Sequence, residues 1–480
     1  MFYDERIHAG RGKAFRNTII LAVVLLAVYG AIHTACLFIL HDTKNPLAFI
    51  IEPLCLAAGL MILIYGETAF GGKDRDEMRE YQKNCYYAKA FYVFLYIFAG
   101  VYCVFAPIQS TYLLDSKVFS TSTGAVFYTG FFKPNLLLFV VEIPCFLFLL
   151  LQFKRSEMPF NAAFLTEDRS VYWRRVWKKI LKFGGYCALF TLVSLAASIL
   201  YLAINSETTF VIDIGLPFSV LLAGVLTWLE FSLEYFIFSA AERSSDRAVQ
   251  RGQISGATMA FCWAGYGLSL AVNLVYFVLG LLGQRHAVQT VKLTSGVLNP
   301  FAELASYLIP LFFIYLLSEL LPLHDRGLNR IGYIYVIVSM MSIPISKCIY
   351  PIAATSSIVH SFEKTYSLRF YIQGFQMLIN PATAVLLVLV ISRLYKNGLT
   401  SKWYCALPIL PIAYMVVGVL PEMGFLLNSW AQYAVSILVD ALYIVMYVCL
   451  RRKLCAHPLP VGDPADGDLE GIAPESGEAV

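Results

Sequence analysis

Residues 66–89, with the sequence GETAFGGKDRDEMREYQKNCYYAK, are the first long polar and basic segment of the chain. Two long apolar runs precede this segment, and a third one overlaps its end. A basic connector between apolar helices stays preferentially on the cytoplasmic side of a membrane. The segment therefore predicts a chain that crosses a membrane several times, and it helps to fix the direction of the first crossings.

The composition also favours a membrane protein. Hydrophobic residues make up 59% of the 480 residues and charged residues 14%, against about 25% charged residues in soluble domains. Since about 20 apolar residues span the hydrocarbon as a helix, a chain of this length accommodates about twelve crossings. We therefore expect an all-α fold, namely a polytopic integral membrane protein with about twelve transmembrane helices.

The apolar runs agree with this number. Helices of this length satisfy their own backbone hydrogen bonds in lipid. The runs are 17–40, 46–67, 86–107, 134–153, 180–204, 213–240, 258–283, 299–321, 331–352, 370–394, 403–421 and 431–450. Runs 134–153 and 403–421 are short and interrupted by proline.

Basic residues alternate between successive connectors. Connector 154–179 carries seven Lys or Arg residues, whereas connectors 205–212 and 422–430 carry none. The three connectors between 284 and 369 are evenly charged and indicate no orientation. The positive-inside rule then places both termini in the cytoplasm and predicts a multi-pass protein of the cell membrane.

Short matching sequences predict an internal duplication. Tyr-Cys-Ala-Leu occurs at 186–189 and again at 404–407, and Asn-Pro begins the second run at Asn45 and the eighth at Asn299. The matches follow the order that two parallel six-helix halves require. The expected segments are 1–16 (cytoplasmic N-terminal segment), 17–240 (first six-helix half), 241–257 (cytoplasmic connector), 258–453 (second six-helix half) and 454–480 (acidic, disordered cytoplasmic tail).

Residues 170–183, SVYWRRVWKKILKF, combine tryptophans with basic residues. This pattern predicts an amphipathic segment at the membrane interface that leads into the fifth run. Two interpretations stay open: general anchoring by aromatic and basic side chains, or a specific lipid site.

Charged side chains inside apolar runs are costly and mark candidate sites for a solute or an ion. The candidates are Glu52, Glu142, Glu230, Glu234, Glu303, Lys347 and Asp440. Glu230 and Glu234 share one helix face, and two carboxylates this close would not both be ionised, which suits proton exchange or cation binding. Each acid could equally have a structural role, and Lys347 could extend to the outer surface. Together the acids predict a cavity that prefers cations or protons to anions.

Enzyme signatures are absent from the sequence. Residues 66–74 lack the GK[ST] ending of a phosphate-binding loop, because Asp74 stands where the metal-binding hydroxyl is needed. No HExxH or GxSxG motif occurs, and the 11 cysteines form no CxxC pair. We therefore expect no catalytic residues, no metal site and no cofactor apart from a coupling ion, H⁺ or Na⁺.

Residues 71–77, GGKDRDE, follow the second run, and the aromatic third run ends in Phe105-Ala106-Pro107. This order resembles the multidrug and toxin extrusion (MATE) family, in which Gly-x-x-Asp-x-x-x-Ala follows the second span; Glu77 and Met78 stand in the region of that alanine. Asp-Arg at 74–75 and 325–326 is similar to the loop motif of the major facilitator superfamily, without its Gly-Arg-Arg continuation. Both resemblances imply two six-helix halves, a central cavity and alternating access, and the first also implies efflux by antiport.

The sequence thus predicts a secondary active transporter for a small cationic or neutral solute, coupled to protons or sodium, with Glu52, Glu142, Glu230 and Asp440 as cavity acids. A flippase for a lipid-linked substrate is the second transport hypothesis, and it would need a basic cavity. An integral-membrane enzyme or a non-transporting scaffold is the hypothesis of a different class. The expected partners are the lipid bilayer and a small-molecule substrate, with no nucleic acid.

Overall fold

The computed structural model describes residues 5–39, 51–70, 77–115, 141–157, 169–204, 210–281, 287–358, 362–419 and 429–459, and within these ranges it is helical and contains no strand. Two short 3-10 helices, η5 (Leu321–Leu323) and η6 (Lys402–Ala406), lie in connectors. The α-helices are α1 (Glu5–Ile39), α2 (Ile51–Phe70), α3 (Glu77–Asp115), α6 (Ile143–Glu157), α7 (Arg169–Ile204), α8 (Phe210–Gln250), α9 (Gly256–Leu281), α10 (Ala287–Glu319), α11 (Arg326–Ile358), α12 (Phe362–Lys396), α13 (Leu410–Val419) and α14 (Ser429–Ala456).

Seven helices of the described ranges are long and apolar enough to cross a membrane. They belong to α1, α2, α7, α9, α10, α12 and α14. This finding is compatible with a membrane-embedded, all-helical protein, but it does not reach the expected count of about twelve. The interrupted runs give short helices: α6 has 15 residues and α13 has 10. Both are shorter than the about 20 residues that span the hydrocarbon, although part of run 134–153 lies outside the described residues.

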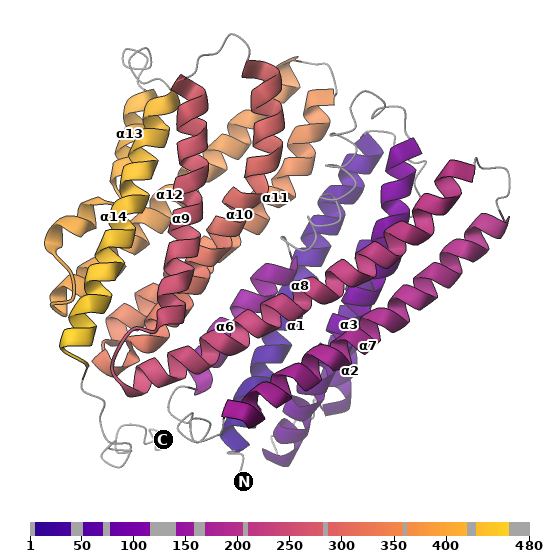
Figure 1. The fold of residues 1–480 in the computed structure, drawn as a ribbon, viewed down its shortest axis with the longest axis horizontal. Helices are drawn as coiled ribbons and strands as arrows, with labels where there is room; N and C mark the ends of the chain where they lie inside the picture. Colours follow the sequence, from indigo (N-terminus) through magenta and orange to yellow (C-terminus); the bar gives the residue numbers. More distant parts are fainter. Residues whose placement is uncertain are drawn as a thin grey trace, which may run out of the picture.

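The helices pack as two neighbouring groups (Figure 1). In the first group α1 packs against α2, α3 and α6, while α7 pairs with α8 and contacts α3. In the second group α9 packs against both α10 and α14, and α11 pairs with α12. Helix α1 begins and α14 ends at the same end of the molecule (Figure 1). The groups pair their helices differently, so the expected duplication stays a prediction.

The largest core cluster belongs to the second group. Phe312 and Phe313 of α10 pack there with Tyr335 of α11 and Tyr447 of α14. Helix α6 of the first group joins the same cluster through Leu147 and two further leucines. Since lipid tails are as apolar as leucine, close packing favours this association within a membrane. Helix α6 therefore ties the first group to the second.

The polar segment 66–89 helps to hold three helices together. Glu67 of α2 accepts hydrogen bonds from Arg16 of α1 (2.7 Å), Lys83 of α3 (2.6 Å) and Tyr87 of α3 (2.9 Å). A carboxylate with several charge-assisted donors forms stronger hydrogen bonds than a neutral acceptor does. Three of these four side chains come from residues 66–89, so this segment also has a packing role.

A second ionic cluster joins the two groups. Lys154 of α6 is buried and lies 2.7 Å from one carboxylate oxygen of Glu242 in α8 and 3.7 Å from Asp246. The hydroxyl of Tyr315 in α10 donates a hydrogen bond of 3.0 Å to the other oxygen of Glu242. Glu242 therefore connects α6, α8 and α10 at one point.

Three expected boundaries change in the structure. Helix α8 continues through Gln250, so residues 251–255 are all that remains non-helical of the expected connector 241–257. Residues 170–183 are the first turns of α7 rather than a separate segment. The expected tail 454–480 begins inside α14, and residues beyond 459 lie outside the described residues.

The two Tyr-Cys-Ala-Leu matches have different local structures. Residues 186–189 lie within the continuous helix α7, whereas residues 404–407 lie in η6 and the turn after it. Pro408 and Pro411 follow the second copy, and proline both removes a backbone donor and clashes with the preceding helical turn. Neighbouring prolines thus override the weak helix preference of the four shared residues.

Candidate functional site

A cavity of about 440 Å³ lies inside the second helix group. Helices α9, α10, α11, α12 and α14 line it, together with the segment around η6 and α13. Its polar lining residues are Ser269, Asn273, Ser306, Tyr335, Ser339, Ser342, Asn380, Thr383, Tyr414, Gln432, Ser436, Asp440 and Tyr443. All of the described residues that line the cavity belong to the second group.

The broken segment before α13 contributes one wall. Pro408 lies in the turn after η6, Pro411 lies in the first turn of α13, and both line the cavity. Proline is tolerated in the first turn of a helix, where its missing donor leaves no hydrogen bond unmade. The sequence therefore starts a new, short helix here instead of continuing a long one, and the non-helical backbone before it lines the cavity.

Asp440 is the one carboxylate among the lining residues. Its Oδ2 accepts hydrogen bonds from Ser269 Oγ at 2.8 Å and from Asn273 Nδ2 at 3.3 Å, both in α9. Ser269 and Asn273 lie four residues apart and so share one face of their helix. The packing of α9 against α14 thus supplies two donors to a carboxylate inside an apolar helix bundle.

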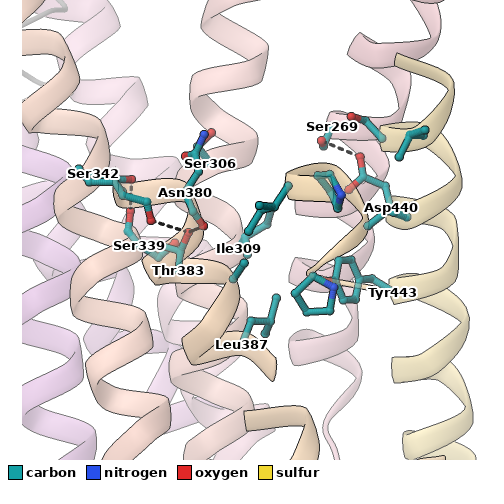
Figure 2. Close-up of a pocket in the computed structure, with 18 of the residues that line it drawn as sticks. Ser269, Ser306, Ile309, Ser339, Ser342, Asn380, Thr383, Leu387, Asp440 and Tyr443 are labelled. Atoms are coloured by element: carbon teal, nitrogen blue, oxygen red, sulfur yellow. Dashed lines mark hydrogen bonds between the residues drawn. The ribbon is translucent and has the colours of Figure 1, made fainter. Parts of the chain in front are cut away.

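Hydroxyl groups occupy the opposite wall. Figure 2 shows Ser339, Ser342, Asn380 and Thr383 across the cavity from Asp440, with Ile309 between the two walls. Ser342 Oγ donates to the Ser339 carbonyl (2.7 Å), and Thr383 Oγ1 donates to the Asn380 carbonyl (2.9 Å). Each hydroxyl keeps acceptor capacity after donating its proton. The cavity therefore has a negatively charged wall and a neutral polar wall.

The charge balance of the lining selects among ligands. Among the described lining residues, Asp440 is the only acidic one and there is no Lys, Arg or His. A buried carboxylate favours an approaching cation and disfavours an anion. The arrangement can bind a small cation, or a neutral solute rich in hydrogen-bonding groups, and its volume falls in the about 300–1,000 Å³ range of ligand pockets.

Glu52, Glu142, Glu234 and Glu303 are not among the described residues that line this cavity. Glu52 lies in the first turn of α2, where it is buried, and Glu142 directly precedes α6. Their neighbours Cys55 and Val141 belong to one core cluster of the first group. Glu234 in α8 and Glu303 in α10 are half-buried. Within the described part of the chain, the structure therefore does not gather the predicted acids around one cavity.

For two of the predicted candidates, the structure describes the helix but not the side chain. Glu230 belongs to α8 and Lys347 to α11, but their side chains lie outside the described residues. The predicted sharing of one helix face by Glu230 and Glu234 is compatible with the continuous helix α8. The predicted proton exchange between them stays a prediction.

Most of the residues that line the cavity are neutral, so they were not among the charged candidates predicted from the sequence. In α14, Gln432, Ser436 and Asp440 follow each other at intervals of four residues, and α11 repeats this pattern with Tyr335 and Ser339. Such spacing places polar groups on one helix face. Neutral polar residues at helical intervals inside apolar runs could therefore have predicted part of the cavity lining from the sequence.

No group of three His, Cys, Asp or Glu residues in the described ranges could hold a metal ion. Of the residues that carry the MATE-like order, 71–76 lie outside the described residues, whereas Glu77 and residues 105–107 belong to α3. Comparisons with protein-family models, with curated proteins and with solved structures find no match to this chain.

Proposed function

We propose that this protein is a secondary active transporter of a small cationic or neutral polar solute. The observation that carries the proposal is the cavity in the second helix group, where Asp440 is the single charged side chain among the described lining residues. Asp440 binds either the cationic group of the solute or a coupling ion, H⁺ or Na⁺. Ser269 and Asn273 hold the carboxylate in place for this purpose.

The hydroxyl-rich wall provides a second set of contacts for the solute. Ser339, Ser342, Asn380 and Thr383 offer hydrogen bonds at the side of the cavity away from Asp440. A solute with a cationic or hydroxyl group at one end and further polar groups at the other satisfies both walls. Because a buried polar group without a partner is costly, a purely apolar solute of the same size would bind less well.

Alternating access requires that one end of a solute pathway be closed while the other is open. At the end that carries the basic connectors, Glu242 links Lys154 and Tyr315, and so the first group to the second. Arg155 of α6 also lies over the ring of Tyr333 in α11, 5.9 Å from its centroid. We infer that this end is closed in the present conformation and that these contacts break when it opens.

We further propose about twelve crossings with both termini in the cytoplasm. Helices α3, α8 and α11 have 39, 41 and 33 residues. At about 1.5 Å per residue each of them exceeds the about 30 Å of hydrocarbon. The short helices α6 and α13 would complete the count together with flanking chain. A MATE-like, efflux identity rests on residues 71–77 and 105–107 alone.

The cavity lining also weighs against the alternatives. A flippase for an anionic lipid-linked substrate needs basic residues, and the described lining contains none. An integral-membrane enzyme needs a general base or acid with a reacting partner, and the described lining offers Asp440 no His, Lys or second carboxylate. A non-transporting scaffold would not require a polar cavity between apolar helices.

Ligand-induced stabilisation of the purified full-length protein tests the proposed chemistry. Small amines with hydroxyl groups, such as choline, and neutral polyols are compared with gluconate, a hydroxylated anion, while thermal unfolding is followed. We expect amines or polyols to raise the midpoint of unfolding and gluconate to leave it unchanged, because a ligand that binds the folded state stabilises it. Stabilisation by gluconate alone would reject a cation-selective cavity.

Transport is then measured in vesicles with an imposed pH gradient, using the amine or polyol that stabilises best. We expect Asp440→Asn to abolish gradient-driven flux, since the variant keeps the size of the side chain but loses its charge. Glu142→Gln is the comparison, because Glu142 lies outside the cavity lining. Unchanged flux in Asp440→Asn, or equal loss in both variants, would contradict the role of the second-group cavity.

A further inference from the structure

The first turns of α7 expose basic residues on one face. Val176, Ile180 and Phe183 form the buried stripe of this part of the helix, which packs against α8 and α3. The exposed basic side chains are Arg169, Arg174, Arg175, Lys178, Lys179 and Lys182. Helix α7 contains no Asp or Glu over its whole length, Arg169–Ile204. The cluster therefore has no acidic partner within its own helix.

The spacing of these residues makes the helix self-repelling. Arg174, Lys178 and Lys182 follow each other at intervals of four residues, and so do Arg175 and Lys179. Like charges at this interval on a helix destabilise it. On the facing helix α8, Glu242 lies 2.7 Å and Asp246 3.7 Å from Lys154. An external anion would relieve this repulsion.

The position along the helix indicates which anion is available. Beyond Lys182 the exposed face of α7 becomes apolar, and Leu189, Leu192 and Val193 are all more than half exposed. A face that changes from basic to apolar marks the boundary between headgroups and hydrocarbon. Arg174 and Lys182 are about 12 Å apart along the axis at 1.5 Å per residue. The basic cluster thus lies at headgroup level.

Aromatic residues fix the orientation of this surface. Trp173 and Trp177 pack against Phe236 of α8, at ring distances of 5.0 and 6.2 Å, and Trp177 remains 53% exposed. Lys179 lies over the ring of Tyr235 (5.7 Å). Tryptophan with an exposed edge favours the membrane interface. The pair α7–α8 therefore presents a preformed surface rather than a set of loose side chains.

Arg243 of α8 contributes to the contact between α7 and α8. Its guanidinium lies over the ring of Tyr172, 4.9 Å from the centroid, and its Nη1 is buried without an acceptor among the described residues. A buried donor that lacks an acceptor is costly. Because this donor is buried, a lipid headgroup cannot reach it, and Arg243 does not belong to the exposed basic surface.

We propose that the surface formed by Arg174, Lys178, Lys182 and Trp177 binds the phosphate headgroups of anionic phospholipids. Trp177 and Leu181 lie at the boundary with the acyl chains, while the basic side chains contact phosphate oxygens. The proposal is independent of the transport function. The occupant is a lipid rather than a soluble anion, because the basic cluster continues directly into an apolar, exposed face.

Native mass spectrometry of the purified full-length protein, titrated with phosphatidylglycerol or phosphatidylcholine, tests the proposal. We expect wild-type protein to bind phosphatidylglycerol more tightly, and rising salt to weaken that preference. The triple variant Arg174→Gln/Lys178→Gln/Lys182→Gln should bind phosphatidylglycerol at least about tenfold more weakly, since each basic residue near an anionic surface contributes about fivefold. Its binding of phosphatidylcholine should not change.

The matched control is Arg326→Gln/Arg330→Gln/Lys396→Gln, which removes the same charge from exposed positions of α11 and α12. It should keep wild-type affinity for phosphatidylglycerol. The charge-retaining variant Arg174→Lys/Lys178→Arg/Lys182→Arg should keep it as well, which separates charge from folding. Equal affinity of the wild type for both lipids, or equal weakening in both neutralised triples, would overturn the proposal.

Discussion

Asp440 Oδ2 in α14 accepts a hydrogen bond of 2.8 Å from Ser269 Oγ in α9, although 171 residues separate the two in the chain. This bond connects the first and last helices of the second group across the wall of the cavity. It holds the single carboxylate of the cavity in a defined position. Replacing Ser269 measures how much this contact contributes to the stability of the fold.

Ser269→Ala removes one of the two donors to Asp440 and leaves the carboxylate less satisfied. We expect the free energy of unfolding to fall by about 1.5–3 kcal/mol, because a hydrogen bond to a charged group contributes about that much. Reversible unfolding in mixed detergent micelles measures the change. Ser306→Ala is the control, since Ser306 also lines the cavity but bonds the Ala302 carbonyl of its own helix. Similar losses in both variants would mean that the hydrogen bond to Asp440 contributes no more to stability than a serine bond within one helix.

Glu319 is fully buried at the end of α10 and holds the start of α9. It accepts hydrogen bonds from the backbone N–H of Ser255 (3.0 Å) and from Thr258 Oγ1 (2.7 Å). Glu319→Ala leaves both donors buried without this acceptor, so we expect a loss of about 2–3 kcal/mol in the free energy of unfolding. Glu319→Gln keeps one acceptor and should lose less.

The comparison for Glu319 is Glu80→Ala, at an exposed position in the first turn of α3. Its effect should stay within about 0.5 kcal/mol, as is usual for surface substitutions. Unfolding of the two variants is measured under identical detergent conditions. A Glu319→Ala variant as stable as Glu80→Ala would show that α9 does not depend on this carboxylate.

Asp325 lies in the connector before α11, and its lowered pKa predicts that its contribution to stability depends on pH. Partial burial raises the pKa of Asp325, but hydrogen bonds and a nearby cation outweigh that effect and hold it below the ordinary value of 3.8. The bonds come from Asn397 (2.8 Å) and from the backbone N–H of Gly327 and Leu328, and the cation is Arg393. The carboxylate is therefore stabilised in its ionised form.

A lowered pKa in the folded state means that the stabilisation is present above the ordinary pKa and is lost as the pH falls through the folded-state value. At pH 7 we expect Asp325→Ala to cost about 1 kcal/mol, as for other caps of helix N-termini. The difference from wild type should shrink below a pH of about 4. Unfolding at a series of pH values measures it, and a difference that grows on acidification would reject the assignment.

Two glycines in the α7–α8 pair should respond in opposite directions to alanine. A Cβ at Gly224 would lie 1.9 Å from Thr191 Oγ1, whereas a Cβ at Gly185 would meet nothing within 4 Å. We expect Gly224→Ala to destabilise the protein by about 1–3 kcal/mol through overpacking. Gly185→Ala should stabilise it by about 0.5–1 kcal/mol, because alanine favours the helix. Thermal unfolding of both variants checks the signs, and equal signs would place the helix contact elsewhere.

The sequence predicted the helical class and one of the cavity residues. Asp440 stood out because a carboxylate within an apolar run is costly, and the same reasoning applied equally to Glu52 and Glu142. Only the packing of α9 against α14 distinguishes Asp440, since it brings Ser269 and Asn273 to that carboxylate. Glu52 and Glu142 instead adjoin the core of the first group. A cost that depends on composition alone cannot rank acids whose neighbours come from distant segments.

The neutral lining residues could have been found in part. Gln432 and Ser436 precede Asp440 at helical spacing, so the polar face of α14 is visible in the sequence. The opposite wall is less accessible to such reasoning. Ser339 of α11 and Thr383 of α12 meet across the cavity from Asp440 because α11 pairs with α12 and the chain breaks at Pro408. Helix periodicity indicates which residues share a face, but not which faces meet.

By itself the sequence determined a helical, membrane-compatible chain, because apolar runs of this length must satisfy their backbone hydrogen bonds internally. It also determined the polar character of residues 66–89 and the candidate Asp440. The tertiary structure decided that Glu67 of that segment ties three helices together, and that the cavity lies within the second group alone. These outcomes depend on side-chain fit between helices far apart in the chain, such as Gly224 against Thr191, and local composition does not encode that fit.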